Sequence, residues 1–177
     1  MEWKLKSCSE TIDFAPALAR EQIMALPYAP CLTKDRTEYR RHKRERLVRG
    51  THLDAKTHRS IWVFSEKIAI HGSISPEHAA VARTEAKAIL GPGVVFSEPT
   101  WTFFLSRAEA PRPPAEVLEL VVPMLSPARG NFGGSFQFNP SVKILTFRGN
   151  NHLFVMTSNQ TKEFHDDCCT AIGQLFV

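Results

Sequence analysis

The chain has 177 residues, of which 43% are hydrophobic and 23% charged, a balance typical of a soluble globular protein with one domain or two small lobes. No apolar run approaches the length of a membrane span, and the charged N-terminus lacks the apolar core of a signal peptide. The four cysteines show no disulfide-framework spacing, which favours a reducing compartment.

The first half of the chain predicts a strand, a short helix, a hairpin and a long helix. The strand segments have apolar or alternating side chains. Asp13 and Ser75 are suited to cap the two helices, and Gly91 to end the second. The predicted elements cover residues 2–7, 14–26, 60–65, 67–72 and 76–90.

A basic segment separates the short helix from the hairpin. Residues 33–60 hold ten Lys/Arg against four Asp/Glu, so the net charge of +4 leaves −2 for the rest of the chain. We consider three interpretations: a solvated loop or strand edge charged against aggregation, a phosphate-facing surface, and a localisation signal. The basic residues of the dense part are Arg40, Arg41, Lys43, Arg44 and Arg46.

The same order of elements begins again after Gly93. Strands are predicted at residues 101–106, 135–138, 142–147 and 152–156, and helices at 116–125 and after the N-cap Ser158. Both the strand ends Phe64 and Phe147 and the caps Ser75 and Ser158 lie 83 residues apart. The chain therefore predicts two repeats, 1–92 with an enlarged basic segment 33–60, and 93–177.

Two such halves, joined about a pseudo-twofold axis, predict an α+β fold with one curved antiparallel sheet and helices on one of its faces. Alternation turns Ile68, Ile70 and Ile144 toward the helices. The helix-free face would then carry Trp62, Phe64, Ala69, His71, Lys143, Leu145, Phe147, Leu153 and Val155. This face is too apolar to be a solvent-exposed surface, so it either binds a partner or belongs to an ordinary two-sided core.

The second half carries Phe132, Pro140, Gly149 and an apolar strand that ends in Phe147. The corresponding segments of the first half are residues 28–30, 61–64 and 67–72. In these residues and in the order of its elements, nearly the whole chain resembles the TATA-box-binding protein (TBP) family. The resemblance implies a TBP-like saddle with its helices on the convex face, in a divergent or viral lineage.

By this resemblance the chain is a transcription initiation factor that binds and bends double-stranded promoter DNA through the minor groove. Its further partners would be general transcription factors or RNA polymerase subunits. Its location would be the nucleus or another intracellular site of transcription, such as a viral factory or the cytoplasm. Neither a membrane nor a cofactor is implied.

The resemblance also assigns residues to the DNA interface. Phe132 and Phe147 map onto one wedge pair, and Phe64 onto the other, with its partner near Leu32 or Leu47. The groove floor would be formed by Trp62, Ala69, His71, Leu145, Leu153 and Val155. Lys143 and the five basic residues of the dense segment complete the predicted DNA-binding set.

Two departures from the family pattern bear on specificity. Residues 2–7 and 101–106 lack the asparagine with which the family reads the centre of its site, so strict TATA preference is not implied. Residues 127–131 stand where the family has an acidic cluster that binds one general factor, so binding of that factor is not implied either.

The alternative function is a saddle-fold scaffold that binds a protein, instead of DNA, through the same helix-free face.

The densest cluster of reactive side chains is at residues 165–169. His165 and Cys169 are spaced to share a metal on a helix, but two further ligands are not evident. The neighbouring aspartates oppose a thiolate, so a metal- or cysteine-dependent enzyme is the third and weakest hypothesis. Phe164, Cys168, Ile172 and Leu175 predict the packed helix face, with Cys169 nearer the surface. We expect no catalytic and no metal site.

Overall fold

A computed structural model describes residues 1–26, 29–32, 39–47, 57–114, 116–117, 132–147 and 150–177; β2, β3 and β8 are described by their backbones. The chain forms two compact units, residues 8–100 and residues 1–7 with 101–177. The predicted repeats were 1–92 and 93–177, whereas in the structure residues 1–7 belong with residues 101–177, and residues 93–100 belong with residues 8–92. The Cα of Gly173 lies so close to Trp3 that an added Cβ would be 3.3 Å from its Nε1.

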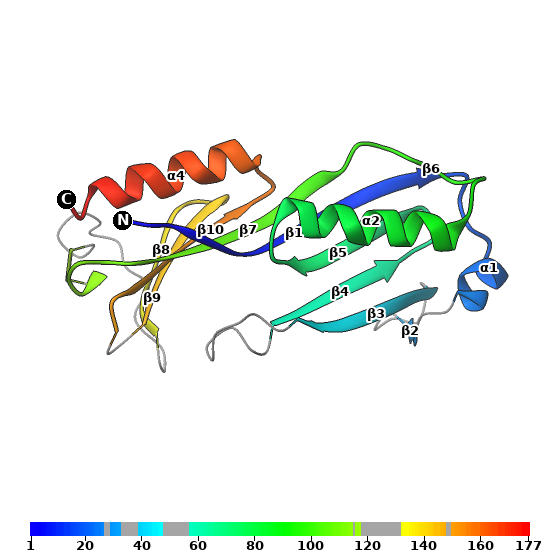
Figure 1. Cartoon of the computed structure of the whole chain (residues 1–177), viewed down its shortest axis with the longest axis horizontal. Helices are drawn as coiled ribbons and strands as arrows, with labels where there is room; N and C mark the ends of the chain where they lie inside the picture. Colours follow the sequence, from blue (N-terminus) through cyan, green and yellow to red (C-terminus); the bar gives the residue numbers. More distant parts are fainter. Residues whose placement is uncertain (27–28, 33–38, 48–56, 115, 118–131, 148–149) are drawn as a thin grey trace. The chain divides into compact units, whose positions relative to one another are not determined.

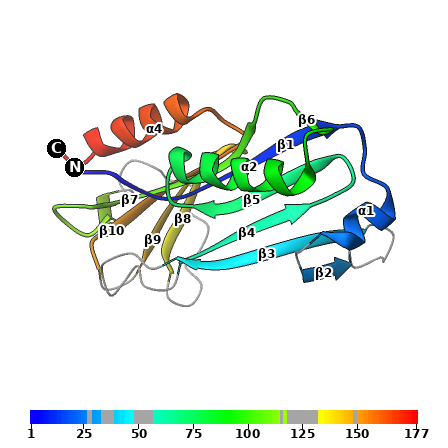
Figure 2. The ribbon, with the colours of Figure 1, turned by 45° about the vertical axis from the view of Figure 1, so that its right-hand side comes forward.

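The unit of residues 8–100 is an antiparallel sheet with helix α2 on one face (Figures 1 and 2). Its strands are hydrogen-bonded in the order β2-β3-β4-β5-β1, and β6 also pairs with β1. The strands are β1 (Lys4–Ala15), β2 (Ala29–Leu32), β3 (Tyr39–Leu47), β4 (Thr57–Val63), β5 (Lys67–Ser73) and β6 (Val95–Phe96). The helices are α1 (Arg20–Ala25) and α2 (Pro76–Leu90).

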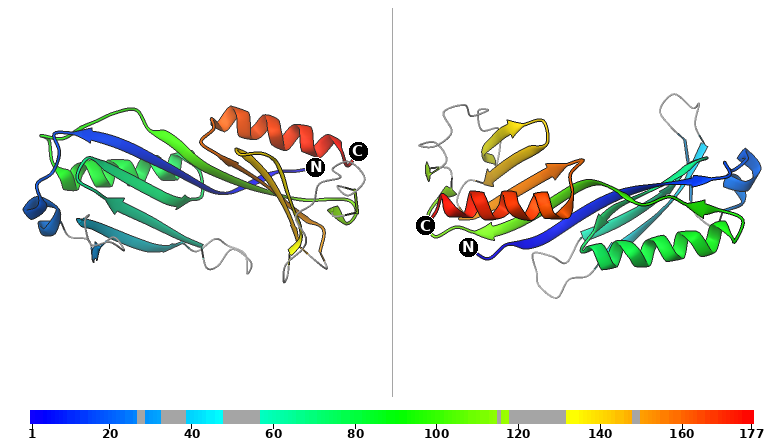
Figure 3. Two further views of the ribbon diagram at one scale, coloured as in Figure 1. Left: turned by 180° about the vertical axis from the view of Figure 1, so that it is seen from behind. Right: turned by 90° about the horizontal axis from the view of Figure 1, so that it is seen from above.

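The second unit repeats this layout, with helix α4 on one face of its antiparallel strands (Figure 3, right). Its strands are hydrogen-bonded in the order β7-β10-β9-β8. They are β7 (Thr100–Glu109), β8 (Phe132–Asn139), β9 (Val142–Phe147) and β10 (His152–Ser158), and α4 is Lys162–Gln174. The α+β class is thus confirmed. The helix expected at residues 116–125 falls largely outside the described residues.

Local sequence signals set the bounds of α2. The Ser75 side chain accepts a hydrogen bond from the His78 amide at 3.1 Å, and Pro76 stands in the first turn. Gly91 ends the helix at a φ of 89°, which glycine adopts without steric cost. The predicted helix 76–90 is confirmed.

The predicted cap of α4 was wrong by three residues. Ser158 ends β10, and Thr161 instead accepts a hydrogen bond from the Phe164 amide at 3.1 Å. The packed face shifts as well, because His165, Cys169, Ile172 and Gly173 are the buried residues of the helix. Phe164 is 37% exposed, so it lies outside this face.

The short helix predicted for residues 14–26 is present as α1, but its predicted start and its cap at Asp13 were wrong. Residue 13 continues β1, opposite Lys67, and the helix begins only at Arg20. Burial of Ile12 and Phe14 in the core under α2 stabilises the extended conformation more than a cap stabilises a helix. Tertiary packing therefore overrides the local capping signal.

Each unit has its own apolar core between the sheet and its long helix. Under α2 the core includes Ile61, Ile68 and Ile70, which are all fully buried. Under α4 it includes Ile144, Leu153 and Val155, also fully buried. No helix within the described residues is long and apolar enough to cross a membrane.

Candidate nucleic-acid interface

The face of β7, β10 and β9 turned away from α4 carries half-exposed apolar side chains. Along each strand, buried residues on the α4 side alternate with half-exposed residues on the other side. In register, Leu105 lies opposite Met156, and Phe154 opposite Leu145. We call this surface the apolar patch, formed by Phe103, Leu105, Leu145, Phe154 and Met156.

The structure corrects the predicted floor of this face. Leu153 and Val155 are fully buried in the core under α4, so their placement on the helix-free face was wrong. Phe154 and Met156 occupy that face instead. The β9–β10 register pairs Val155 with Ile144, and directly opposed residues share a face. A one-residue error of phase moves a whole strand to the wrong side.

In the unit of residues 8–100, the face away from α2 carries Trp62 and Phe64, both half-exposed. Ala69 is directly opposite Trp62 and is 5% exposed, whereas His71, two residues on, is exposed. The Lys67 ammonium lies 5.1 Å from the centre of the Phe64 ring, a cation–π contact. The structure thus brings four predicted interface residues onto one face.

The two residues of the predicted wedge pair are backbone partners at the end of the β8–β9 ladder. The backbone of Phe132 lies directly opposite that of Phe147. In the other unit Phe64 follows the end of β4, while Leu32 and Leu47, the predicted partner positions, end β2 and β3. Whether any of them contacts DNA stays a prediction.

The predicted basic residues lie on strand β3. The backbone of Arg41 pairs with Val63, and that of Arg44 with Ser60, which is itself opposite His71. The basic segment was expected to be part strand and part loop, and its dense part lies within strand β3, beside β4. The predicted basic residues on β3 are Arg40, Arg41, Lys43, Arg44 and Arg46.

Two further cations lie on the face away from α4. Lys143 is half-exposed opposite Met156, as predicted for this face, and Arg107 is half-exposed opposite Phe154. Arg107 was missed because the strand was expected to end at Ser106. Extending the alternation of Phe103 and Leu105 by two residues would have found it.

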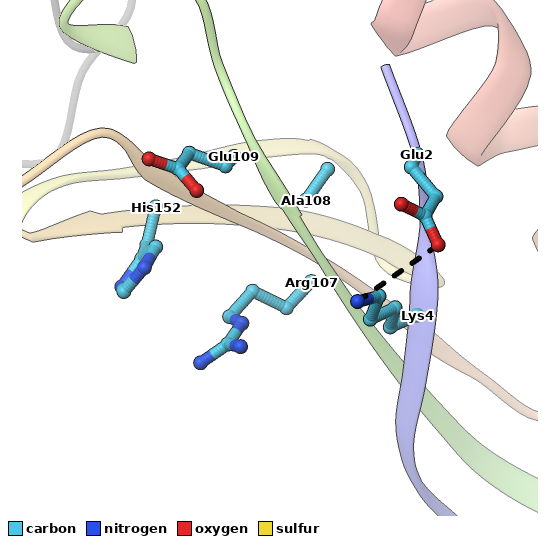
Figure 4. A pocket seen from close by; sticks show the side chains of 6 residues that line it. All are labelled: Glu2, Lys4, Arg107, Ala108, Glu109 and His152. Carbon is cyan, nitrogen blue, oxygen red and sulfur yellow. Dashed lines mark ion pairs between the residues drawn. The ribbon is translucent and has the colours of Figure 1, made fainter. Parts of the chain in front are cut away.

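A polar pocket of about 140 Å³ has Arg107 in its lining (Figure 4). Because Arg107 lies opposite Phe154, the pocket adjoins the apolar patch. Lys4 Nζ lies 3.8 Å from Glu2 Oε1, and both side chains are largely exposed. All of the lining residues belong to the unit of residues 1–7 and 101–177. They are Glu2, Lys4, Arg107, Ala108, Glu109 and His152.

The histidine–cysteine cluster on α4 lies inside the core. His165 is fully buried, with its ring nitrogens 2.8 Å from Ser106 Oγ and 2.9 Å from Thr157 Oγ1. Burial lowers the pKa of His165 to about 4 and raises the pKa of Cys169 to about 12. A neutral thiol and an inaccessible imidazole fit a structural network rather than a nucleophile.

The expected exposure of the two adjacent cysteines was wrong, because Cys169 is 3% exposed and Cys168 is half-buried. The packed face of α4 is shifted by one residue toward the C-terminus, which turns Cys169 inward. Cys169 Sγ lies 3.6 Å from His165 Nε2. The described residues contain no cluster of three or more His, Cys, Asp or Glu that could hold a metal.

No protein-family model and no curated protein sequence matches the chain. Its structure is similar to that of Methanococcus jannaschii TBP, with a TM-score of 0.66 and 16% sequence identity. The similarity covers 99% of this chain and 98% of that one. Similarity at so low an identity, extending over both chains, shows the fold and not the activity. The chain therefore has the TBP fold.

Proposed function

We propose that the chain is a divergent TBP-like transcription initiation factor that binds duplex DNA in the minor groove through the helix-free faces of its two units. The apolar patch carries the proposal. Two phenylalanines, two leucines and a methionine stay half-exposed on one face, although each strand buries its alternate residues fully. Contiguous apolar surface of this kind marks a binding site, and the fold likeness supports DNA as its partner.

The chemistry of the two faces suits a minor groove. Apolar side chains contact the sugars and base edges there, and aromatic or aliphatic wedges can partly unstack a base step. Phe132 and Phe147, opposite one another in the β8–β9 ladder, are the proposed wedges of one unit. In the other unit Phe64 is the proposed wedge, with its partner at Leu32 or Leu47, and Trp62 belongs to the proposed groove floor.

Cations supply the part of the affinity that depends on salt. Lys143 lies beside the apolar patch, and the basic residues of β3 lie beside β4. Each phosphate contact made by such a residue releases condensed counterions, so affinity falls as salt rises.

The proposal also includes protein partners and a location. The chain would bind general transcription factors or RNA polymerase subunits and would act at an intracellular site of transcription.

The test measures binding of fluorescently labelled random and A·T-rich duplexes across a salt series by anisotropy. The wild-type chain should bind with a steep salt slope. Phe154→Ala should weaken binding at least tenfold, whereas Phe164→Ala, on the solvent side of α4, should not. Lys143→Ala should reduce the magnitude of the salt slope by about one.

A protein-binding scaffold is the second candidate function. It is favoured by the absence of asparagine from residues 1–15 and 100–109, which form β1 with its preceding residues and β7. A folded wild-type chain that binds no duplex at low salt would refute the DNA proposal and leave the scaffold. Circular dichroism of the same sample would establish that the chain is folded.

A further inference from the structure

The polar pocket begins where the apolar patch ends. In the β7–β10 ladder, Arg107 lies opposite Phe154 of the patch, and Glu109 lies opposite His152. Arg107, Glu109 and His152 therefore stand on the same helix-free face as the patch, one step farther along the strands. A duplex that covers the patch would also cover this pocket.

The charges lining the pocket are balanced. Lys4 and Arg107 are opposed by Glu2 and Glu109. A phosphate group would meet two carboxylates as well as two cations, so most of its attraction would cancel. The pocket is thus better suited to a neutral group that both donates and accepts hydrogen bonds.

Within the described residues, two of these four charged groups have neither an ion-pair nor a hydrogen-bond partner. The Glu2–Lys4 pair, at 3.8 Å with side chains 82% and 62% exposed, contributes little. Within the described residues, neither the guanidinium of Arg107 nor the carboxylate of Glu109 has an ion-pair or hydrogen-bond partner. Their Cα atoms are about 7 Å apart along one strand. The pocket therefore presents one free donor group beside one free acceptor group.

In the minor groove, an A·T pair presents only acceptors, while a G·C pair adds the N2 amino donor of guanine. An ionised carboxylate can only accept hydrogen bonds, so Glu109 finds a partner only at guanine. Arg107 can donate to the acceptors that every pair presents. On the basis of the proposed function, we infer that this pocket reads the minor-groove edge of one G·C pair in the bound duplex.

The test isolates a single amino group. Duplexes with an A·T background carry one G·C pair at successive positions, and a matched set replaces guanine by inosine, which lacks only the N2 amino group. At one position, competition anisotropy should show the wild-type chain binding the guanine duplex about tenfold more tightly than the inosine duplex.

Three variants assign this preference to the pocket. Glu109→Ala should abolish the preference for guanine, and Glu109→Gln, which keeps an acceptor oxygen, should retain part of it. Glu163→Ala, an exposed change on α4, should leave it intact. Glu109 is itself exposed, so its replacement should leave the fold unchanged, which circular dichroism checks.

Three results would overturn the inference. Equal affinity for guanine and inosine at every position, with Phe154→Ala still weakening binding, refutes the pocket and keeps the proposed function. Variants of Arg107 and Glu109 that change only the salt slope would show a phosphate contact instead. A folded chain that binds no duplex refutes both the pocket and the proposed function.

Discussion

Acid should destabilise this protein through His165. The imidazole is fully buried between Ser106 and Thr157, with both ring nitrogens within 2.9 Å of a hydroxyl oxygen. In the neutral ring, one nitrogen donates and the other accepts. Protonation would bury a charge and force both hydroxyls to accept, so the folded state resists it.

The magnitude follows from the pKa shift. Burial, the main cause, lowers the pKa of His165 from 6.5 to about 4, with Lys162 lowering it further and Asp166 opposing. Between these values the unfolded chain binds a proton that the folded chain does not. The free energy of unfolding therefore falls as pH drops from 6.5 toward 4, by about 3 kcal/mol from this residue alone. Above pH 6.5 the contribution is fully present.

Urea unfolding, followed by tryptophan fluorescence between pH 7 and pH 4, measures this loss in the wild type and in His165→Gln. The glutamine amide can still donate and accept, but it does not titrate. At pH 7 the variant should be the less stable, and its deficit should shrink by about 3 kcal/mol toward pH 4. A deficit that stays constant across this range, or an NMR titration of His165 near 6.5, would refute the reasoning.

Three other changes should alter stability in predictable ways, all measurable by urea or thermal unfolding. Burial raises the pKa of the Glu10 carboxyl above 4.5, so the free energy of unfolding that this group contributes falls as pH rises through its folded pKa. Glutamine does not titrate, so between pH 4 and pH 7 the free energy of unfolding of Glu10→Gln should fall less than that of the wild type. Ile144→Ala, in the core under α4, should cost about 2–5 kcal/mol, and half-exposed Leu145→Ala clearly less; equal costs would contradict the assigned faces. Thr161→Ala should cost about 1 kcal/mol by removing the cap of α4, whereas Ser158→Ala removes no cap, so similar losses would argue against the observed helix start.

Elements whose signals are local could be predicted from the sequence. The Ser75-Pro76 start and the Gly91 end of α2 act within one helical turn, and the helix begins and ends where they predict. Asp13 also carries a capping signal, but burial of Ile12 and Phe14 keeps that segment in a strand. Local energies of about 1 kcal/mol decide an element only where apolar burial does not exceed them.

The candidate site was harder to predict because its faces depend on register. Each strand shows its own alternation, which separated Ile144 from Leu145 correctly. The phase between two strands depends instead on the turn that joins them, and residues 148–149 lie outside the described residues. Hence Val155 was assigned to the face that Phe154 occupies. The apolar character of the face was predictable, but of the five residues of the apolar patch only Leu145 was predicted.

The buried face and the helix-free face of the sheet carry different side chains, so DNA binding and folding stability can be tested separately. On β9, Ile144 is fully buried under α4, while its neighbour Leu145 is half-exposed on the helix-free face. An ordinary two-sided core would bury both. Since different side chains fill the core of each unit and form its helix-free face, changes in the apolar patch should weaken binding while lowering the free energy of unfolding clearly less than changes in the core do. Loss of DNA binding in such folded variants would therefore report on the interface itself.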